Sequence, residues 1–239
     1  MFISTRAISL NTIKLSDKKF IATIYTEYYG LQSCLVYENT RVNNYLRIFN
    51  QFAILDIVIF HKPNKTLQQI KEVSINFIPQ TIPFDIRKIT LSTFIKEIII
   101  ASIKEQEQNN ELFNFLDNTI LNLDNKTTGL AFFHLQFMTN FLSYLGCKPI
   151  DNYSKIYKYF DMLEGHFTDK KPSHPYVIEP PQTAVLHNLL NNDDEYNLNN
   201  LKNKMIRDNM LQLLLEYYKI HLPGMGNINS HKILREVLD

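Results

Sequence analysis

The sequence predicts an α+β protein in which a small β barrel is followed by an α-helical domain. In the first eighty residues, β-branched and aromatic residues gather in short runs separated by turn signals. After Pro79 and Pro83, apolar residues recur at helical spacing instead. A chain of 239 residues can hold two small domains, and we expect a barrel over residues 1–80 and a helical domain over residues 81–239.

The strands of the barrel are predicted from residue type and alternation. Ile21 to Thr26 is β-branched and aromatic, and Tyr28-Tyr29-Gly30 supplies a turn before Leu31 to Tyr37 returns as a strand. Phe52 to Phe60 is apolar at nearly every position, which suits a barrel strand, and Leu67 to Phe77 follows it. About five short strands in ~80 residues suit a Greek-key barrel, and their periodicity does not separate an OB-fold from an SH3-like barrel.

Helices are predicted where apolar residues recur every three or four positions. Thr90 is the expected cap of the first helix, and the helix from Leu130 to Leu145 carries the clearest amphipathic stripe before Gly146 and Pro149 end it. The expected helices contain Leu91–Ile99, Leu112–Leu123, Leu130–Leu145, Leu201–His221 and Ile233–Leu238.

Composition excludes several classes of protein. The longest apolar runs, such as Ile98 to Ala101, are too short to cross a bilayer, and the N-terminus lacks the succession of a signal peptide. Two cysteines, Cys34 and Cys147, suit a reducing compartment without a disulfide framework. We therefore expect a cytoplasmic protein that does not associate with membranes.

The sequence contains no recognisable catalytic signature. It has no P-loop, no GxSxG and no HExxH, and its seven histidines are dispersed. His166 and His174, with Asp169 between them, could form a metal site, but loop histidines are more often solvated. We therefore expect no catalytic residue, no metal and no cofactor.

The C-terminal stretch from Leu213 to Leu238 reads LLLEYYKIHLPGMGNINSHKILREVL. Pro223-Gly224 ends one helix, and Ser230 can cap the next. This order resembles the C-terminus of the RecO family of bacterial recombination mediators, which commonly finish with leucines, a tyrosine pair, an HLPG-like break and a last helix. Other segments resemble the Bacteroidetes-type members of that family in order and spacing: STRAISL (4–10), FIATIYTEYYGLQSCLV (20–36), FAILDIVIFH (52–61), LQQIKEVSI (67–75), IPFDIRK (82–88) and LEGHFTDKKPSHP (163–175).

The resemblance implies a fold and a function. It implies that the barrel is an OB-fold and that the chain is a bacterial, nucleoid-associated DNA repair protein without a catalytic step. Such a protein binds single- and double-stranded DNA and anneals complementary strands. It also acts on single-strand-binding protein and, with RecR, helps to load RecA.

Basic and aromatic residues of the barrel are the candidate DNA contacts. Residues 1–85 hold nine Lys/Arg and six Asp/Glu, a balance of +3 in a chain of net charge +1. Single-stranded DNA is held by a basic groove and by ring faces on which bases stack, and Tyr25, Tyr28, Tyr45 and Phe49 could supply rings. The candidate DNA-binding residues are Arg6, Lys14, Lys18, Lys19, Arg41, Arg47, Lys62 and Lys65.

A second candidate site concerns a protein partner. The resemblance implies capture of the acidic tail of single-strand-binding protein, whose terminal phenylalanine needs an apolar slot and whose carboxylate needs a cation. The candidate partner-binding residues are Lys126, Phe132, Phe133, Phe137 and Lys148.

One departure from the family concerns zinc. Many RecO proteins carry a four-cysteine zinc site, but the corresponding stretch, Cys147 to Glu164, contains one cysteine. We expect this region to be held without metal, by packing of Ile150, Tyr153, Ile156, Tyr157, Tyr159 and Phe160. Two other classes of function stay open: an OB-type adaptor for another polymer or protein, and an enzyme whose dispersed residues the sequence does not assemble.

Overall fold

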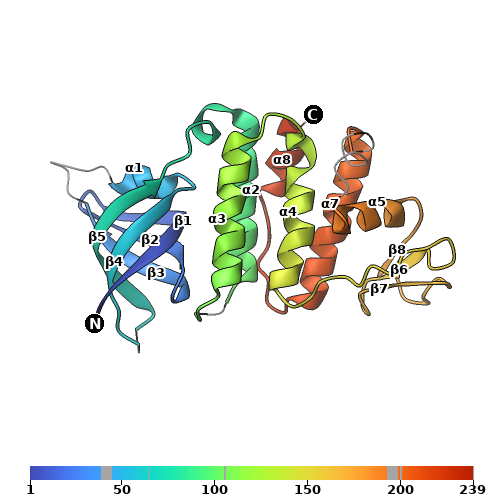
Figure 1. The fold of residues 1–239 in the computed structure, drawn as a ribbon, viewed down its shortest axis with the longest axis horizontal. Helices are drawn as coiled ribbons and strands as arrows, with labels where there is room; N and C mark the ends of the chain where they lie inside the picture. The colour runs from blue at the N-terminus through green and yellow to red at the C-terminus, as the bar shows by residue number, and fades with distance from the viewer. Residues whose placement is uncertain (39–44, 64, 105, 193–198, 200, 239) are drawn as a thin grey trace. The chain divides into compact units, whose positions relative to one another are not determined.

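The computed structural model describes residues 1–38, 45–63, 65–104, 106–192, 199 and 201–238 (Figure 1). The chain forms two compact units, Met1–Lys126 and Thr127–Asp239. No helix among these described residues is long and apolar enough to cross a membrane.

A closed five-stranded barrel begins the first unit, in the order β1-β2-β3-β5-β4. All neighbouring strands are antiparallel except β3 and β5, which pair in parallel over Ser33–Leu35 and Leu67–Gln69. This five-stranded topology is that of an OB-like barrel, so the predicted fold class is confirmed. The strands are β1 (Phe2–Ser16), β2 (Lys19–Thr26), β3 (Gly30–Tyr37), β4 (Ile54–Phe60) and β5 (Leu67–Phe77).

The barrel core follows from strand alternation. In β2 and β3 every second side chain points inward, and Phe20, Ala22 and Cys34 are at most 1% exposed. Helix α1 (Tyr45–Asn50) packs on this core, because the ring of its Phe49 meets the ring of Phe20 edge-on at 5.5 Å. Burial removes apolar surface from water, which is the main source of the barrel's stability.

The first unit ends with the 3-10 turn η1 (Ile82–Phe84) and the helices α2 (Ile86–Ser102) and α3 (Asn110–Asn125). The prediction that Thr90 caps the first helix was wrong. Asp85 is the cap, because its extended backbone lets its carboxylate accept from the Arg87 amide, whereas the Thr90 hydroxyl donates back to the Ile86 carbonyl inside the helix. Hydrogen bonds from Arg87 lower the pKa of Asp85 to about 2.

The segment that joins the barrel to α2 is fixed by one buried carboxylate. Asp124, near the end of α3, accepts hydrogen bonds from the backbone amides of Gln80, Thr81 and Ile82 at 2.7–2.9 Å. Lys88 donates to the Asp124 carbonyl at 2.6 Å. Because these donors come from both sides of the predicted boundary at residue 80, the connection behaves as an ordered part of the first unit; the division into domains at 80/81 stays a prediction.

The second unit is mainly helical. Helix α4 (Leu130–Tyr144) was predicted to be amphipathic, but it is buried on nearly every face, and Leu135, Met138 and Phe141 are fully buried. It packs against α5 (Gln182–Leu190) and α7 (Lys204–His221), so it forms the centre of this unit. The last helix is α8 (His231–Val237), as the sequence predicts.

A small three-stranded sheet lies between α4 and α5 in the sequence, with the order β7-β6-β8. Its strands are β6 (Tyr159–Asp161), β7 (His166–Thr168) and β8 (Val177–Ile178). The Asn152 side chain makes two hydrogen bonds to the Phe167 backbone. Its Oδ1 accepts from the Phe167 amide at 2.8 Å, and its Nδ2 donates to the Phe167 carbonyl at 2.9 Å. This sheet occupies the region where the sequence lacks zinc cysteines. The expected packing is only partly present, because Phe160 is buried whereas Ile150, Ile156 and Tyr157 are exposed, and hydrogen bonds contribute as well.

Candidate nucleic-acid interface

The outer surface of β2 and β3 is the central part of the candidate interface. Because alternate residues point outward, Ile21 and Thr23 of β2 lie directly across from Leu35 and Ser33 of β3. Ile13 of β1 continues this row, since it pairs with Ile21 and is 56% exposed. The surface is therefore a partly exposed strip of aliphatic and hydroxyl side chains across three strands.

The β1–β2 hairpin supplies three cations at one end of this strip. Lys14, Lys18 and Lys19 are all exposed, and Lys19 pairs with Tyr37 at the end of β3. Lys14 forms an exposed ion pair with Asp17 at 2.8 Å, and its hydrogen bond lowers the pKa of that carboxyl. The hairpin thus groups three of the predicted DNA-binding residues in one place.

Helix α1 adds a further cation at the same end of the barrel. Arg47 is exposed on α1, and the Asn50 end of that helix accepts a hydrogen bond from Thr12 of β1 at 2.5 Å. The backbone amide of Glu38, just after β3, donates to the Lys18 carbonyl at 2.8 Å, which ties the hairpin to the connection before α1. The predicted contact Arg41 lies outside the described residues.

The connection between β4 and β5 supplies cations at the other end. Lys62 and Lys65 belong to this loop, and Gln68 organises it: the Lys62 amide donates to its Oε1 at 2.8 Å, and its Nε2 donates to the Lys65 carbonyl at 2.6 Å. Tyr29 of the β2–β3 turn stacks on His61 at 4.1 Å. The loop therefore lies beside the β2–β3 turn, at the opposite end of the strip from the hairpin.

The candidate rings have different environments. Tyr25 and Phe49 are each 1% exposed, so they belong to the core and do not present a face to solvent. Tyr25 stacks on Phe113 of α3, with ring centroids 6.4 Å apart. Tyr28, at the β2–β3 turn, is 46% exposed, and Tyr37 is 53% exposed. These two tyrosines have a surface available to a base, as does Phe2 of β1, which is 61% exposed.

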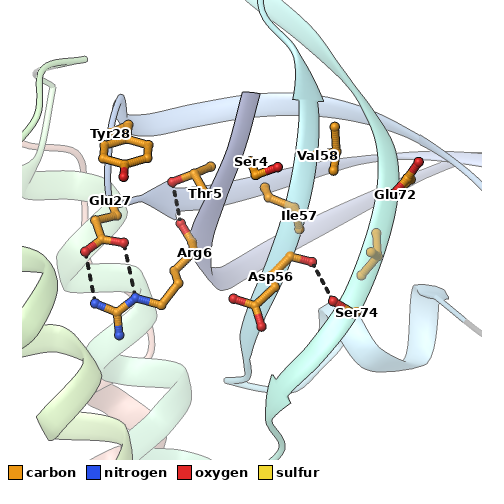
Figure 2. Close-up of a pocket in the computed structure, with 11 residues that line it drawn as sticks. Ser4, Thr5, Arg6, Glu27, Tyr28, Asp56, Ile57, Val58, Glu72 and Ser74 are labelled. Atoms are coloured by element: carbon orange, nitrogen blue, oxygen red, sulfur yellow. Dashed lines mark hydrogen bonds and ion pairs between the residues drawn. The ribbon is translucent and has the colours of Figure 1, made fainter. Parts of the chain in front are cut away.

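Arg6 has carboxylate partners. Its Nε and Nη2 atoms donate to the two carboxylate oxygens of Glu27 at 3.1 and 3.0 Å (Figure 2), and its Nη1 donates to Asp117 at 3.0 Å. The hydrogen bond with Glu27 raises the pKa of the guanidinium. Because two carboxylates compensate its charge, Arg6 differs from the exposed lysines of the hairpin.

The predicted partner-binding residues are distributed over both units. Phe132, Phe133 and Phe137 of α4 are 4%, 8% and 4% exposed. Lys148 follows α4, whereas Lys126 is the C-cap of α3 in the first unit. A peptide could reach the three rings only if their neighbours moved, and their choice as a tail pocket stays a prediction.

The histidines that could suggest a metal site have protein partners. His174 lies 3.1 Å from Asp161, and the same carboxylate accepts from the amides of Leu163 and Glu164. In the part of the chain that the structure describes, no three His, Cys, Asp or Glu side chains gather as metal ligands. The expectation of a metal-free protein stays a prediction.

Sequence reasoning missed the aliphatic strip. Its members, such as Ile13, Ile21 and Leu35, read as ordinary strand residues, because a pattern of alternation does not say which face another element covers. The exposed pair Ile13 and Leu15, placed beside Lys14, was the available signal.

Two family models match the chain in succession. The model described as "Recombination protein O N terminal" matches residues 1–77, and the one described as "Recombination protein O C terminal" matches residues 83–227. The first match covers the barrel strands, and the second extends from the 3-10 turn through α7.

Curated relatives are similar along their whole length. The DNA repair protein RecO of Bacteroides fragilis is 32% identical over 245 residues, with 100% of both chains covered. That of Flavobacterium psychrophilum is 32% identical over 241 residues, with 99% of both chains covered. That of Porphyromonas gingivalis is 26% identical over 249 residues, with 100% of both chains covered.

Proposed function

The chain belongs to the RecO family of DNA repair proteins, and we propose that it binds single- and double-stranded DNA through the outer strip of β2 and β3. The strip is bounded by Lys14, Lys18 and Lys19 at one end and by Lys62 and Lys65 at the other. This arrangement is the observation that supports the proposal. OB-folds use this strand face and the two adjoining loops to bind oligonucleotides.

The dimensions of the strip suit a short length of single strand. Strand β2 has eight residues, which at roughly 3.3 Å per residue gives a surface about 23 Å long. OB-folds cover about 4–16 nucleotides, so the strip would hold the shorter part of that range. Lysines at both ends would neutralise phosphates, and Tyr28 and Tyr37 would offer ring faces to bases.

Binding by itself can explain annealing. Phosphate neutralisation releases counterions and favours DNA binding at low salt. Two complementary strands held on one protein, or on neighbouring proteins, meet at a raised effective concentration, so pairing becomes nearly intramolecular. This mechanism needs no covalent step, no metal and no cofactor.

The finer parts of the proposal concern partners. We infer that the protein works with RecR to load RecA onto DNA covered by single-strand-binding protein, whose acidic tail it binds. Family membership supports this inference. It also supports action in the bacterial cytoplasm on the nucleoid.

A DNA-binding and annealing experiment tests the proposal. A gel-shift with labelled single-stranded DNA at about 50–200 mM salt should show binding that weakens as salt rises by roughly 0.7 logarithmic units per unit of log salt for each phosphate that the protein neutralises. The protein should also accelerate pairing of complementary oligonucleotides. An adaptor without DNA function would show neither effect, and DNA turnover would identify an enzyme.

A further inference from the structure

The second half of β5 has a neighbouring strand on one side only. Residues from Ile70 to Phe77 pair with β4, whereas the parallel pairing with β3 stops at Gln69. Within the described part of the chain, no strand lies on the other side of this segment. In the described part of the chain no other strand pairs with the amide and carbonyl groups along this edge, so the edge can accept an added strand.

A groove lies on the outer face of β1, β4 and β5, and it extends from Glu72 and Ser74 of β5 across its partner strand β4, away from the free edge. Its volume is about 460 Å³, and its lining includes the carboxylates of Glu27, Asp56 and Glu72 (Figure 2). Among the described residues that line it, Arg6 is the one cation, and it is already paired with Glu27 and with Asp117. Asp56 and Glu72 therefore leave the groove with a negative surface that complements a basic ligand.

The inward side of the same segment is apolar and partly open. Val73 packs against the barrel core, and Ile75, which pairs with Leu55, is 52% exposed. Successive side chains of an added strand would point alternately toward the groove and toward Ile75. A strand beside β5 would lie about 4.8 Å from it and about 10 Å from β4, within reach of a lysine or arginine side chain.

We propose that the β5 edge from Ile70 to Phe77 is a docking site for an extended basic segment of a protein partner. The segment adds as a strand, and its sequence alternates between Lys or Arg and apolar residues. The cations lie over Glu72 and Asp56, and the apolar side chains contact Ile75. Backbone hydrogen bonds supply affinity in this mode of recognition, and the alternate side chains supply specificity.

The edge also carries features that oppose pairing with arbitrary strands. Lys71 is exposed on it, and the register shifts between Val58 and Ile59 of β4, opposite this part of β5. Charges and bulges of this kind are common protections against edge-to-edge aggregation. A partner segment that alternates basic and apolar residues complements this edge, whereas an arbitrary apolar strand does not.

Peptide binding by the full chain tests the proposal. The probe is a fluorescein-labelled peptide of alternating Lys and Val, and the control has the same composition in one Lys block and one Val block. Two further peptides carry N-methyl groups on one or the other alternate set of residues. Anisotropy should show binding of the alternating peptide and of only one methylated peptide, because an added strand turns only one set of amides toward β5. Hydrogen exchange of the Ile70–Phe77 amides should slow in the complex.

Charge variants locate the site. Glu72→Lys should lower the affinity for the alternating peptide by at least about tenfold, and Glu72→Gln should lower it less. Glu107→Lys, an equal change at an exposed residue outside the groove, should leave affinity unchanged. Equal binding of the block peptide, binding of both methylated peptides, unchanged affinity in Glu72→Lys, or no binding up to about 1 mM would overturn the proposal. Self-association that disappears in Glu72→Lys would make a second copy the occupant and would overturn it as well.

Discussion

Arg6 of β1 donates a hydrogen bond from its Nη1 atom to Asp117 of α3 at 3.0 Å, and its guanidinium carbon lies 4.7 Å from the ring centre of Phe113 on the same helix. One side chain thus connects the first strand of the barrel with a helix 111 residues away in the sequence. Burial raises the pKa of Asp117, and the positive charge of Arg6 opposes that rise. Arg6 therefore links β1 to α3 within the first unit, and its role in DNA binding stays a prediction.

Replacement of Arg6 separates this structural role from DNA binding. Arg6→Gln removes charged hydrogen bonds to Glu27 and Asp117, so the free energy of unfolding should fall by about 1–3 kcal/mol in chemical denaturation. The salt dependence of DNA binding should stay unchanged when measured on folded protein. A variant of normal stability with a shallower salt slope would instead assign Arg6 to the DNA, as the sequence predicts.

The hairpin lysines should neutralise phosphates of the bound DNA. Replacement of Lys14, Lys18 and Lys19 together with alanine should weaken the binding of single-stranded DNA of every sequence alike. The slope of log affinity against log salt should become shallower by about 0.7 for each phosphate that is no longer neutralised. A matched double variant, Lys62→Ala with Lys65→Ala, tests the other end of the strip. If the triple variant kept both affinity and slope, the hairpin would not belong to the interface.

The small sheet of the second unit should be stable without zinc. Protein purified without a chelator should contain no stoichiometric zinc by elemental analysis, and one zinc per chain would contradict this prediction. The two hydrogen bonds from Asn152 to the Phe167 backbone should contribute to the stability of the sheet instead. Asn152→Ala leaves both backbone groups of Phe167 without this partner, so it should lower the free energy of unfolding by about 1–3 kcal/mol.

Stability should fall in mild acid because of His134. This side chain of α4 is fully buried, and burial together with the charge of Arg207 lowers its pKa from 6.5 to about 3. The unfolded chain binds a proton as pH falls through 6.5, whereas the folded chain does not, so stability is complete above that pH and decreases below it. Between pH 7 and pH 5 the loss should be about 2 kcal/mol.

Denaturation at both pH values, with His134→Gln and with His166→Gln as the control, checks this prediction. The first variant should remove most of the loss, and the second should leave it in place. Proton uptake on unfolding of the unchanged protein gives the same information if His134→Gln does not fold. No uptake between pH 7 and pH 5 would contradict the assignment.

The tail of single-strand-binding protein should bind in the micromolar range, about −8 kcal/mol. Calorimetry at low salt with the tail peptide measures it, and removal of the terminal phenylalanine should abolish binding. Binding that survives Lys126→Ala and Lys148→Ala would keep the partner and reject the chosen pocket. The two lysine variants are included because Phe132, Phe133 and Phe137 are buried, so the peptide could bind elsewhere on the protein.

Local patterns were enough to predict strands β2 to β5 and helices α2, α3, α4, α7 and α8, but not β1, α1, α5 or the three-stranded sheet. Runs such as Leu31 to Tyr37 and Leu201 to His221 carry their own periodicity, and Gly and Pro mark their ends, so each element can be recognised without its neighbours. The motifs that resemble the RecO family are also short, so they too can be recognised from local sequence. The Thr90 prediction was wrong because the helix already begins at Ile86, so Thr90 lies inside it and Asp85 is the cap.

Tertiary structure decided which charges and rings can meet a ligand. By itself the sequence pattern determined a small β barrel, a following helical part and a set of basic residues in the barrel, and the family resemblance added that the barrel is an OB-fold. Pairing of strands far apart in sequence placed Lys14 and Lys62 at opposite ends of one strip, joined Arg6 to Asp117, and left the edge of β5 without a neighbour among the described strands. These relations depend on contacts between distant residues, and a one-dimensional pattern holds no information about which face another element covers.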